Sequence, residues 1–366
     1  MADVVIAGGG VIGCATAYYL AKAGAGVTLM EKREIAGEAS GAAAGMLVPP
    51  PWATASGDFR DLCLASLRLY PALVGSLLDE TSIDVQYLET GLLVPAESEP
   101  AAAALRQVAR HGGDDVVPLE WVEGETLRRL EPGLSPALPG AAYSPSQRHV
   151  NPGLLTQALA RAAVARGATL RQGAGVAGFA RRGGRVTAVR TEAGDTIDAG
   201  HVVLAAGSWT GRIARRLGAE VPTRPMRGQM VAYRSNAVRH MIWGADGYLV
   251  PKSGGFLFAG ATVEDAGFRT RTTGRGLAGL RRMARSIVPA LRYGEVASAW
   301  AGLRPGSPDG LPVIGRLPGW ENVYVATGHF RNGILLGPIT GKLVAQLVTT
   351  GRTEVPLAPF RAARFG

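Results

Sequence analysis

The sequence predicts an α/β protein of two domains. One is a discontinuous domain built on a parallel sheet, and the second is largely antiparallel β with helices. Three observations predict this fold. The first thirty residues read as strand, glycine turn, helix and strand. Apolar strands followed by glycine recur within His201 to Trp209 and Asn322 to Val348. Alternating patterns of short strands fill 83–145 and 222–295.

The glycine turn near the N-terminus carries the first motif. Val4 to Ala7 is a short apolar run, as expected of a buried parallel strand. Gly8, Gly10 and Gly13 form GxGxxG directly after it. The first permits a tight turn, the second lets a pyrophosphate approach the backbone, and the third lets the helix pack on the strand. The following helix directs free N–H groups toward phosphates, and Glu31 ends the next strand where a ribose binds. The pattern predicts a Rossmann-like dinucleotide site.

A second GxGxxG spacing, Gly173 to Gly178, does not predict another such site. It is followed by the hairpin pattern FARRGGRVTAVRT, so no helix dipole is available to hold a phosphate. With one valid motif, the sequence offers no separate nicotinamide site, and we expect electrons to reach a flavin directly from the substrate.

Three later stretches favour FAD over NAD. Small residues at Ala39 to Leu47 allow the backbone to lie against a flat ring. The stretch from His201 to Trp209 resembles the strand that closes the first sheet of two-domain flavoproteins. Asn322 to Val348 predicts a strand, a glycine loop and a final helix that begins near Gly337-Pro338, because proline suits a first helical turn.

Composition limits the partners and the compartment. The formal net charge is +10, but the arginines are scattered, so we expect a solvated surface and no nucleic-acid partner. RNA stays a rival partner because the charge suits it. Val4 to Leu20 is uncharged but short and rich in glycine, and no later segment reads as a membrane span. With only Cys14 and Cys63, neither a disulfide framework nor a metal site is expected, which predicts a cytoplasmic protein.

Five strings together resemble the D-amino-acid oxidase family of flavoproteins, and within it the glycine oxidases. They are GGGVIG, ASGAAAGML, GYLVPKSGGFLFAGAT, AGLRPGSPDGLPVIG and ATGHFRNGILLGPITG. They span almost the whole chain, and the last two are the most specific. The resemblance implies non-covalent FAD, because the cysteine that attaches FAD near the C-terminus of monomeric sarcosine oxidases has no counterpart after Cys63.

The resemblance also implies which residues bind FAD. Besides Gly8, Gly10 and Gly13, they are Val11, Ile12, Glu31, Lys32, Ala39, Ser40, Ala44, Gly45, Met46, Val176, Gly207, His329, Phe330, Arg331, Asn332, Gly333, Ile334 and Leu335. His329 is expected to contribute its backbone rather than to act as a base, since hydride transfer from an unprotonated amine needs none.

Three residues are implied to act on the substrate. Arg304 matches the arginine that holds the substrate carboxylate, and its guanidinium fork suits that task better than an ammonium would. Its glycine- and proline-rich surroundings place it on a rigid turn. Tyr248 matches a tyrosine that faces the same carboxylate, and Arg331 lies beside the flavin and the entrance.

The implied reaction is oxidative deamination of a small amino acid, with O2 reoxidising the flavin to give H2O2. The substrate stays open among glycine, sarcosine and small D-amino acids, because Asp246, Gly247 and Val263 depart from the glycine oxidase pattern. An oxidase of N-alkyl amino acids and a quinone-linked D-amino acid dehydrogenase are the alternatives. A role in thiamine biosynthesis and a homo-oligomer are also compatible with the resemblance.

The order of the motifs predicts the domain boundaries. We expect 1–82, 146–221 and 296–366 to form the FAD-binding domain, and 83–145 with 222–295 to form the substrate domain above the flavin.

Overall fold

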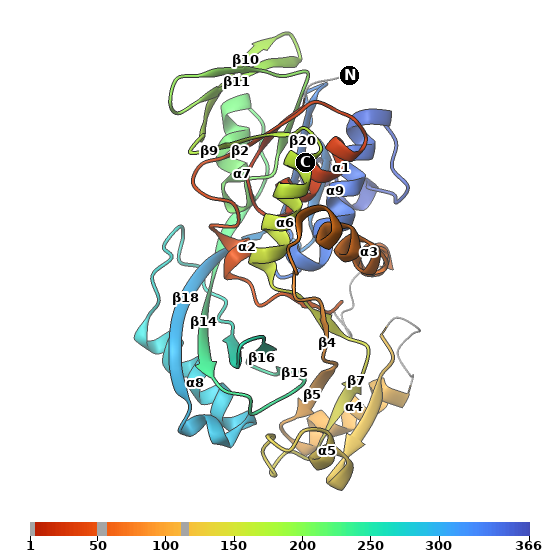
Figure 1. The fold of residues 1–366 in the computed structure, drawn as a ribbon, viewed down its shortest axis with the longest axis vertical. Helices are drawn as coiled ribbons and strands as arrows, with labels where there is room; N and C mark the ends of the chain where they lie inside the picture. Colours follow the sequence, from red (N-terminus) through yellow and green to blue (C-terminus); the bar gives the residue numbers. More distant parts are fainter. Residues whose placement is uncertain (1–3, 50–56, 111–116) are drawn as a thin grey trace.

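The computed structural model describes residues 4–49, 57–110 and 117–366. It is elongated and has two tiers, with a parallel sheet and its helices in one and a large antiparallel sheet in the other (Figure 1). The predicted fold class is confirmed, including the Rossmann-like arrangement at the N-terminus.

The first tier is built on a six-stranded sheet. In spatial order its strands are β19 (Val313–Arg316), β20 (Val323–Thr327), β13 (His201–Leu204), β1 (Val4–Ala7), β2 (Val27–Glu31) and β9 (Thr169–Gln172). All pairs are parallel except β19 with β20. The expectation that β13 closes the sheet is wrong, because β13 pairs with β1 on one side and β20 on the other. Its buried valines suit this central position.

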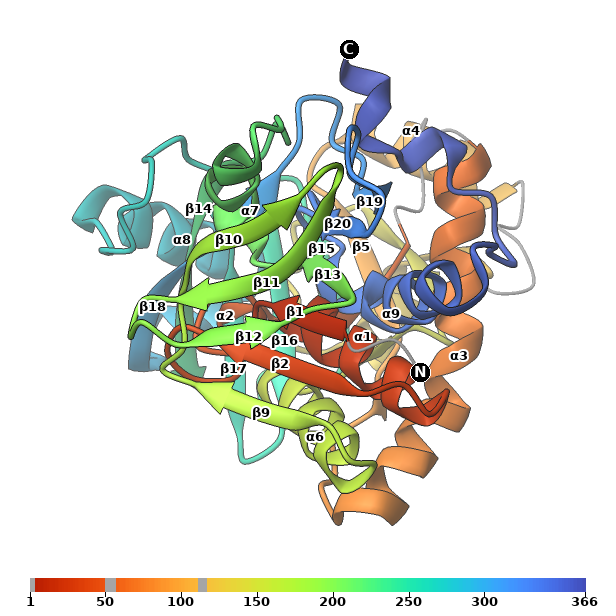
Figure 2. The ribbon, with the colours of Figure 1, turned by 90° about the horizontal axis from the view of Figure 1, so that it is seen from above.

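Helices cover one face of this sheet, and a small sheet covers the other (Figure 2). The helices are α1 (Val11–Lys22), α3 (Gly57–Thr81), α6 (Pro152–Ala165) and α9 (Gly333–Thr350), which share one apolar core. On the opposite face lie β10 (Val176–Arg182), β11 (Arg185–Thr191), β12 (Thr196–Asp198) and α7 (Thr210–Ala214). The hairpin of β10 and β11 confirms that the second GxGxxG spacing opens no helix.

The second tier is an eight-stranded sheet. Its spatial order is β18 (Glu295–Gly306), β14 (Arg224–Arg234), β17 (Phe256–Gly260), β16 (Gly247–Lys252), β15 (Met241–Gly244), β5 (Leu92–Ala96), β7 (Gly140–Ser144) and β6 (Glu120–Glu123). Only β15 and β5 pair in parallel. Three helices flank it, α4 (Glu99–Arg110), α5 (Gly124–Leu130) and α8 (Gly274–Ile287). The sheet extends to Gly306, past the predicted boundary at 295, while the division into domains stays a prediction.

Short elements connect the tiers. α2 (Ala39–Ala42) leads into β3 (Met46–Leu47), which pairs with β8 (Arg148–His149) and through it with β4 (Leu88–Glu89). The long strand β18 rises toward α2 (Figure 1). There the Trp300 Nε1 donates to the carbonyl of Ala42 at 3.0 Å.

The final helix begins earlier than predicted. α9 starts at Gly333, so Pro338 lies inside the helix and not in its first turn. Pro338 has no N–H to donate to the carbonyl of Ile334. The Tyr70 hydroxyl of α3 donates to that carbonyl at 2.5 Å. The Ser66 hydroxyl likewise donates to the Leu335 carbonyl at 2.6 Å. Packing against α3 therefore lets the helix continue through its proline.

The expectation that no later segment is long and apolar enough to span a membrane is wrong, because two helices of the structure meet both criteria. Both α3 and α9 are long and apolar enough, with mean hydropathies of 1.3 and 1.2. Two-thirds of the apolar stretch of α9 and one-third of that of α3 are buried inside the protein. A core helix of this fold meets the same criteria as a membrane span, so the two helices are weak evidence for one.

The bond from Tyr70 predicts a measurable contribution to stability. Tyr70→Phe keeps the ring but leaves the Ile334 carbonyl without its donor, at a cost of about 1–3 kcal/mol. Urea unfolding should show a lower midpoint for this variant. Tyr293→Phe is the control, because Tyr293 is 85% exposed and its variant should unfold like the parent. Equal midpoints for Tyr70→Phe and the parent would contradict the role of this bond.

Candidate active site

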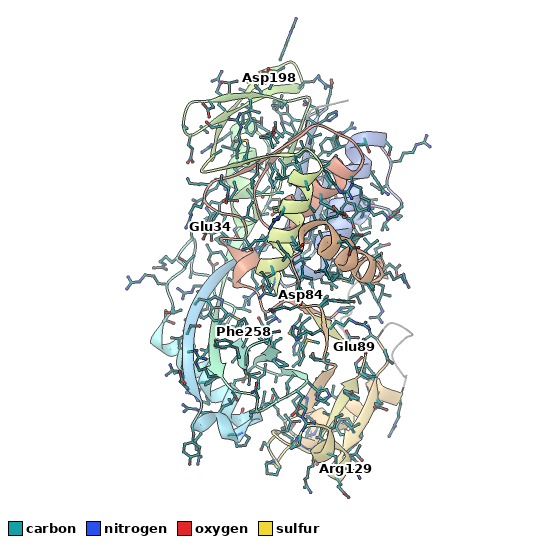
Figure 3. All side chains as sticks on the ribbon, in the orientation of Figure 1. Glu34, Asp84, Glu89, Arg129, Asp198 and Phe258 are labelled. Carbon is teal, nitrogen blue, oxygen red and sulfur yellow. The ribbon has the colours of Figure 1, made fainter. Side chains whose placement is uncertain are left out.

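A cavity of about 780 Å³ runs between the two tiers. It is lined by the glycine turn after β1, the end of β2, the α2–β3 segment, the residues after β13, and the residues before α9. From the second tier, β14, β16 and β18 contribute. In Figure 3, Glu34, which lines the cavity, lies in the first tier above Phe258 of β17.

The glycine turn is shaped by close backbone contacts. Gly8 has a φ of +121°, and a Cβ at this position would lie 2.5 Å from the Ala205 carbonyl oxygen. A Cβ on Gly13 would lie 1.9 Å from the carbonyl oxygen of Gly8. Gly9, which the motif leaves unspecified, is crowded by side chains, since its Cβ would lie 2.6 Å from Ile35 Cδ1 and 2.8 Å from Glu31 Cβ. Sequence reasoning missed Gly9 because the crowding side chains come from distant positions in the sequence.

Two side chains hold the turn against the start of α1. The Glu31 carboxylate accepts from the Gly9 amide at 2.7 Å and from the Arg33 amide at 2.9 Å. The Ser40 hydroxyl accepts from the Val11 amide at 2.9 Å. Glu31, predicted to bind a ribose, therefore also fixes the loop. The remaining first-turn amides of α1 have no acceptor within the helix, which suits a phosphate.

Nearly all of the predicted cofactor residues line the cavity. They are Gly8, Gly10, Val11, Ile12, Glu31, Lys32, Ala39, Ser40, Ala44, Gly45, Met46, Val176, Gly207, His329, Phe330, Arg331, Asn332, Gly333 and Ile334. Two do not line it. Gly13 packs against Gly8, and Leu335 points into the core, where only 1% of it is exposed.

Other lining residues were missed by sequence reasoning. Trp209 and Arg212 come from the segment after β13, and Arg216 follows them. The Arg216 guanidinium donates to the Val176 carbonyl and so joins the segment that follows α7 to β10. Nothing in the local sequence marks Arg212 or Arg216, because each is one exposed-looking arginine among many. Trp209 ends a stretch that the motifs did single out.

Arg304 lies in a strand and not on the predicted turn. β18 pairs with β14 along its whole length, and Arg304 stands opposite Met226. Because β18 is an edge strand, Pro305 is tolerated beside it. The Arg304 Nη1 donates to the Thr262 carbonyl at 3.0 Å. The guanidinium lies over Gly228, whose Cβ would be 2.2 Å from Nη1. A glycine on the neighbouring strand thus makes room for the arginine.

Arg331 faces the same part of the cavity. Burial lowers the pKa of its guanidinium, the positive charge of Arg304 lowers it further, and Tyr248 opposes this. Within the described part of the chain, neither arginine has a carboxylate partner. Two neighbouring cations without a counter-ion form a site for an anion, and a carboxylate matches the guanidinium geometry.

Two further predicted residues complete this end of the cavity. The Tyr248 hydroxyl lies 3.5 Å from Met230 Sδ. His329 is buried, and burial lowers its pKa to about 3, so the imidazole is neutral. Its Nε2 lies 3.0 Å from the Thr340 hydroxyl of α9. The expectation that His329 contributes its backbone to FAD binding and does not act as a base stays a prediction.

A metal site does not emerge from the geometry. Within the three described stretches, no group of three or more histidine, cysteine, aspartate or glutamate side chains could hold a metal ion.

Comparison with known proteins decides the cofactor. A family model described as FAD dependent oxidoreductase, the DAO family, matches residues 3–347. The chain belongs to this family. It is 38% identical to a glycine oxidase of Geobacillus kaustophilus over 99% of this chain and 97% of the relative.

Solved structures agree. A glycine oxidase structure from G. kaustophilus superposes with a TM-score of 0.93 at 36% identity and covers 100% of this chain and 99% of its own. An iminodiacetate oxidase from Chelativorans superposes with a TM-score of 0.90 at 28% identity and covers 98% of each. The protein is therefore an FAD-dependent enzyme that acts on amino acid donors, as the resemblance in sequence implied.

The geometry of the cavity fits FAD. The glycine turn and the start of α1 would hold the pyrophosphate, Glu31 and Val176 the adenosine, and the residues before α9 the flavin ring. When bound, FAD supplies the acceptor for the electrons that leave the substrate. The chain supplies the position and charge around it.

The contact between Arg304 and Gly228 predicts the effect of one methyl group. Gly228→Ala should displace the guanidinium and weaken glycolate binding by about tenfold, because the carboxylate loses its aligned fork. Glycolate titration followed by flavin absorbance measures this. Gly279→Ala on α8 is the control, since its Cβ would meet nothing within 4 Å. FAD content should match the parent in both. Unchanged glycolate affinity in Gly228→Ala would show that the arginine is positioned by other contacts.

Proposed function

We propose that this enzyme catalyses oxidative deamination of glycine, sarcosine and small D-amino acids, with O2 as electron acceptor and H2O2 as product. The pair of uncompensated arginines, Arg304 and Arg331, carries the proposal. It forms an anion site in the same cavity as the residues that fit FAD. An α-amino acid held there by its carboxylate would present its α-carbon at a fixed distance from the guanidinium groups.

The residues divide the work between binding and electrostatics. Arg304 would fix the plane of the carboxylate with two parallel hydrogen bonds, and Arg331 would add charge. Tyr248 faces them from β16. Asn332, Gly333 and Ile334 line the cavity at the start of α9, so the positive end of the helix dipole faces a bound ring. That field would stabilise negative charge on the ring as the substrate is oxidised.

The alternatives share this fold and differ in substrate or acceptor. An oxidase of N-alkyl amino acids would prefer sarcosine to glycine, and a quinone-linked D-amino acid dehydrogenase would form no peroxide. The similarity to glycine oxidases supports the oxidase. Peroxide detection with glycine, sarcosine, D-alanine and D-proline separates the three. A cytoplasmic protein without a membrane or nucleic-acid partner, a homo-oligomer and a place in thiamine biosynthesis belong to the same proposal.

Replacing Arg304 tests the carboxylate site. Loss of one partner of a buried charge pair costs on the order of 2–5 kcal/mol. Arg304→Ala should therefore lower kcat/KM for glycine or sarcosine by roughly 30-fold to several thousand-fold. Arg304→Lys should recover only part, because an ammonium keeps the charge but not the fork. Steady-state kinetics with a check of flavin content measures both. Normal kinetics in Arg304→Ala would place the carboxylate elsewhere.

The positions of the two cysteines predict that FAD is bound without a covalent link to either thiol. Cys14 and Cys63 are buried, and burial raises the pKa of the Cys63 thiol to about 12 and that of Cys14 further. Neither lines the cavity. Acid precipitation should therefore release all of the flavin into the supernatant as FAD. Flavin absorbance that stays in the pellet would reveal a covalent link through some other residue.

A further inference from the structure

The part of the cavity that holds the two arginines also holds one carboxylate. Asp246 lies in the two-residue turn between β15 and β16, where Gly244 pairs with Gly247. It lines the cavity and is exposed to solvent. In the described part of the chain it makes no ion pair. It is one of the residues at which the sequence departs from the glycine oxidase pattern.

Contacts on both sides hold the turn in place. The Ala245 amide donates to a Glu97 carboxylate oxygen at 2.9 Å. A Cβ on Gly247 would lie 2.4 Å from the Gly260 carbonyl oxygen, so the turn packs closely on β17. Glu97 also adds a second negative charge beside Asp246. The backbone of the turn that carries Asp246 is therefore held by Glu97 and by β17.

The same hairpin places Asp246 at the substrate end of the cavity. Trp243 and Tyr248 are paired across the hairpin, and both line the cavity. Tyr248 is near enough to Arg331 to influence its pKa. Asp246 precedes Tyr248 by two residues, in the turn that joins β15 to β16. Asp246 therefore belongs to the end of the cavity at which the arginines would bind a substrate carboxylate.

Of the other carboxylates that line the cavity, Glu34 follows β2 in the first tier, and the rest are engaged elsewhere. Glu31 binds backbone amides, Glu38 pairs with Arg33 at 2.7 Å, and Glu192 pairs with Lys32 at 2.9 Å. These contacts lie along the part of the cavity that would hold adenosine. The Arg212 guanidinium stacks over the Phe268 ring at 3.6 Å. Asp246 is thus the carboxylate that a substrate meets beyond the arginines.

We propose that Asp246 is a specificity-determining residue that disfavours substrates with a second carboxylate on the amine or on the side chain. The inference rests on the proposed function, because it assumes that the arginines hold the first carboxylate. Glycine, sarcosine and neutral D-amino acids satisfy the arginines without approaching Asp246 with negative charge. Iminodiacetate, D-aspartate and D-glutamate would bring two anions together. The fold itself does not impose this choice, since one protein of similar structure is named an iminodiacetate oxidase.

Two matched pairs of compounds test the proposal. Sarcosine and iminodiacetate are the substrates, compared by kcat/KM. Methoxyacetate and diglycolate replace the amine by an ether oxygen, cannot be oxidised in the same way, and are compared by Kd from the flavin absorbance. In each pair the second compound carries one additional carboxylate. The preference is the ratio of kcat/KM for sarcosine to that for iminodiacetate, or the ratio of Kd for diglycolate to that for methoxyacetate. Both ratios are measured in the parent holoenzyme and in Asp246→Asn.

Asp246→Asn should reduce the preference for the singly charged compound by about three- to tenfold, as expected for the loss of one like-charge repulsion in a partly solvated site. High salt should reduce the preference of the parent in the same direction and change that of Asp246→Asn less. Asp246→Glu keeps the charge and should keep the preference. Asp198→Asn is the control for net charge, because Asp198 is exposed on β12 at the far end of the first tier (Figure 3).

The outcomes separate this inference from the proposed function. Equal preferences in the parent and Asp246→Asn, or an equal change in Asp198→Asn, would overturn the role of Asp246. So would a failure of both ether ligands to bind any variant. If the parent oxidises none of the amines but still prefers methoxyacetate, and loses that preference in Asp246→Asn, the proposed function fails while the charge selection stands.

Discussion

Hydrogen bonds to the outer edge of β18 join the two tiers. β18 pairs with β14 on one side only, so the carbonyl groups of its other edge need partners from elsewhere. The Ser208 hydroxyl donates to the Leu303 carbonyl at 3.1 Å, and the Phe330 amide donates to the Pro305 carbonyl at 2.9 Å. These alternate carbonyls flank Arg304. The hydrogen bonds that join the two tiers therefore also hold the backbone on both sides of Arg304. The strand β18 thus positions the substrate arginine against the loop that precedes α9.

Local patterns were sufficient to predict the parts of the fold whose contacts are short-range. The contact of Gly13 with the Gly8 carbonyl and the hairpin that follows Gly173 both depend on neighbours within a few residues. Arg304 was expected on a turn, because Gly-Leu-Arg-Pro-Gly has turn composition, and only its pairing with β14 makes it a strand. The start of α9 was misplaced for a similar reason. The carbonyl left free by Pro338 is satisfied by Tyr70, 264 residues away in sequence.

The residues of the candidate site likewise fall into those that the sequence predicted and those that only the structure reveals. Motifs and family resemblance pointed to most of the cofactor and substrate residues, and nearly all of these line the cavity. They did not point to Gly9 or Gly228, whose importance comes from the side chains that lie over them. Nor could they show that Arg304 and Arg331 have no carboxylate partner among the residues that the structure describes, because a missing partner is a property of the assembled cavity. The charge of the site, and with it the chemistry, emerges only when the two tiers meet.

The burial of the two thiols bears on how the enzyme would withstand the peroxide that the proposed reaction forms. Peroxide oxidises cysteine through the thiolate, and burial with a raised pKa keeps Cys14 and Cys63 protonated and shielded. Two methionines are less protected, because Met46 and Met230 line the cavity in which peroxide would form. Oxidation of either thioether would put a polar group beside the bound cofactor. The lifetime of the enzyme during turnover should therefore depend on these methionines and not on its cysteines.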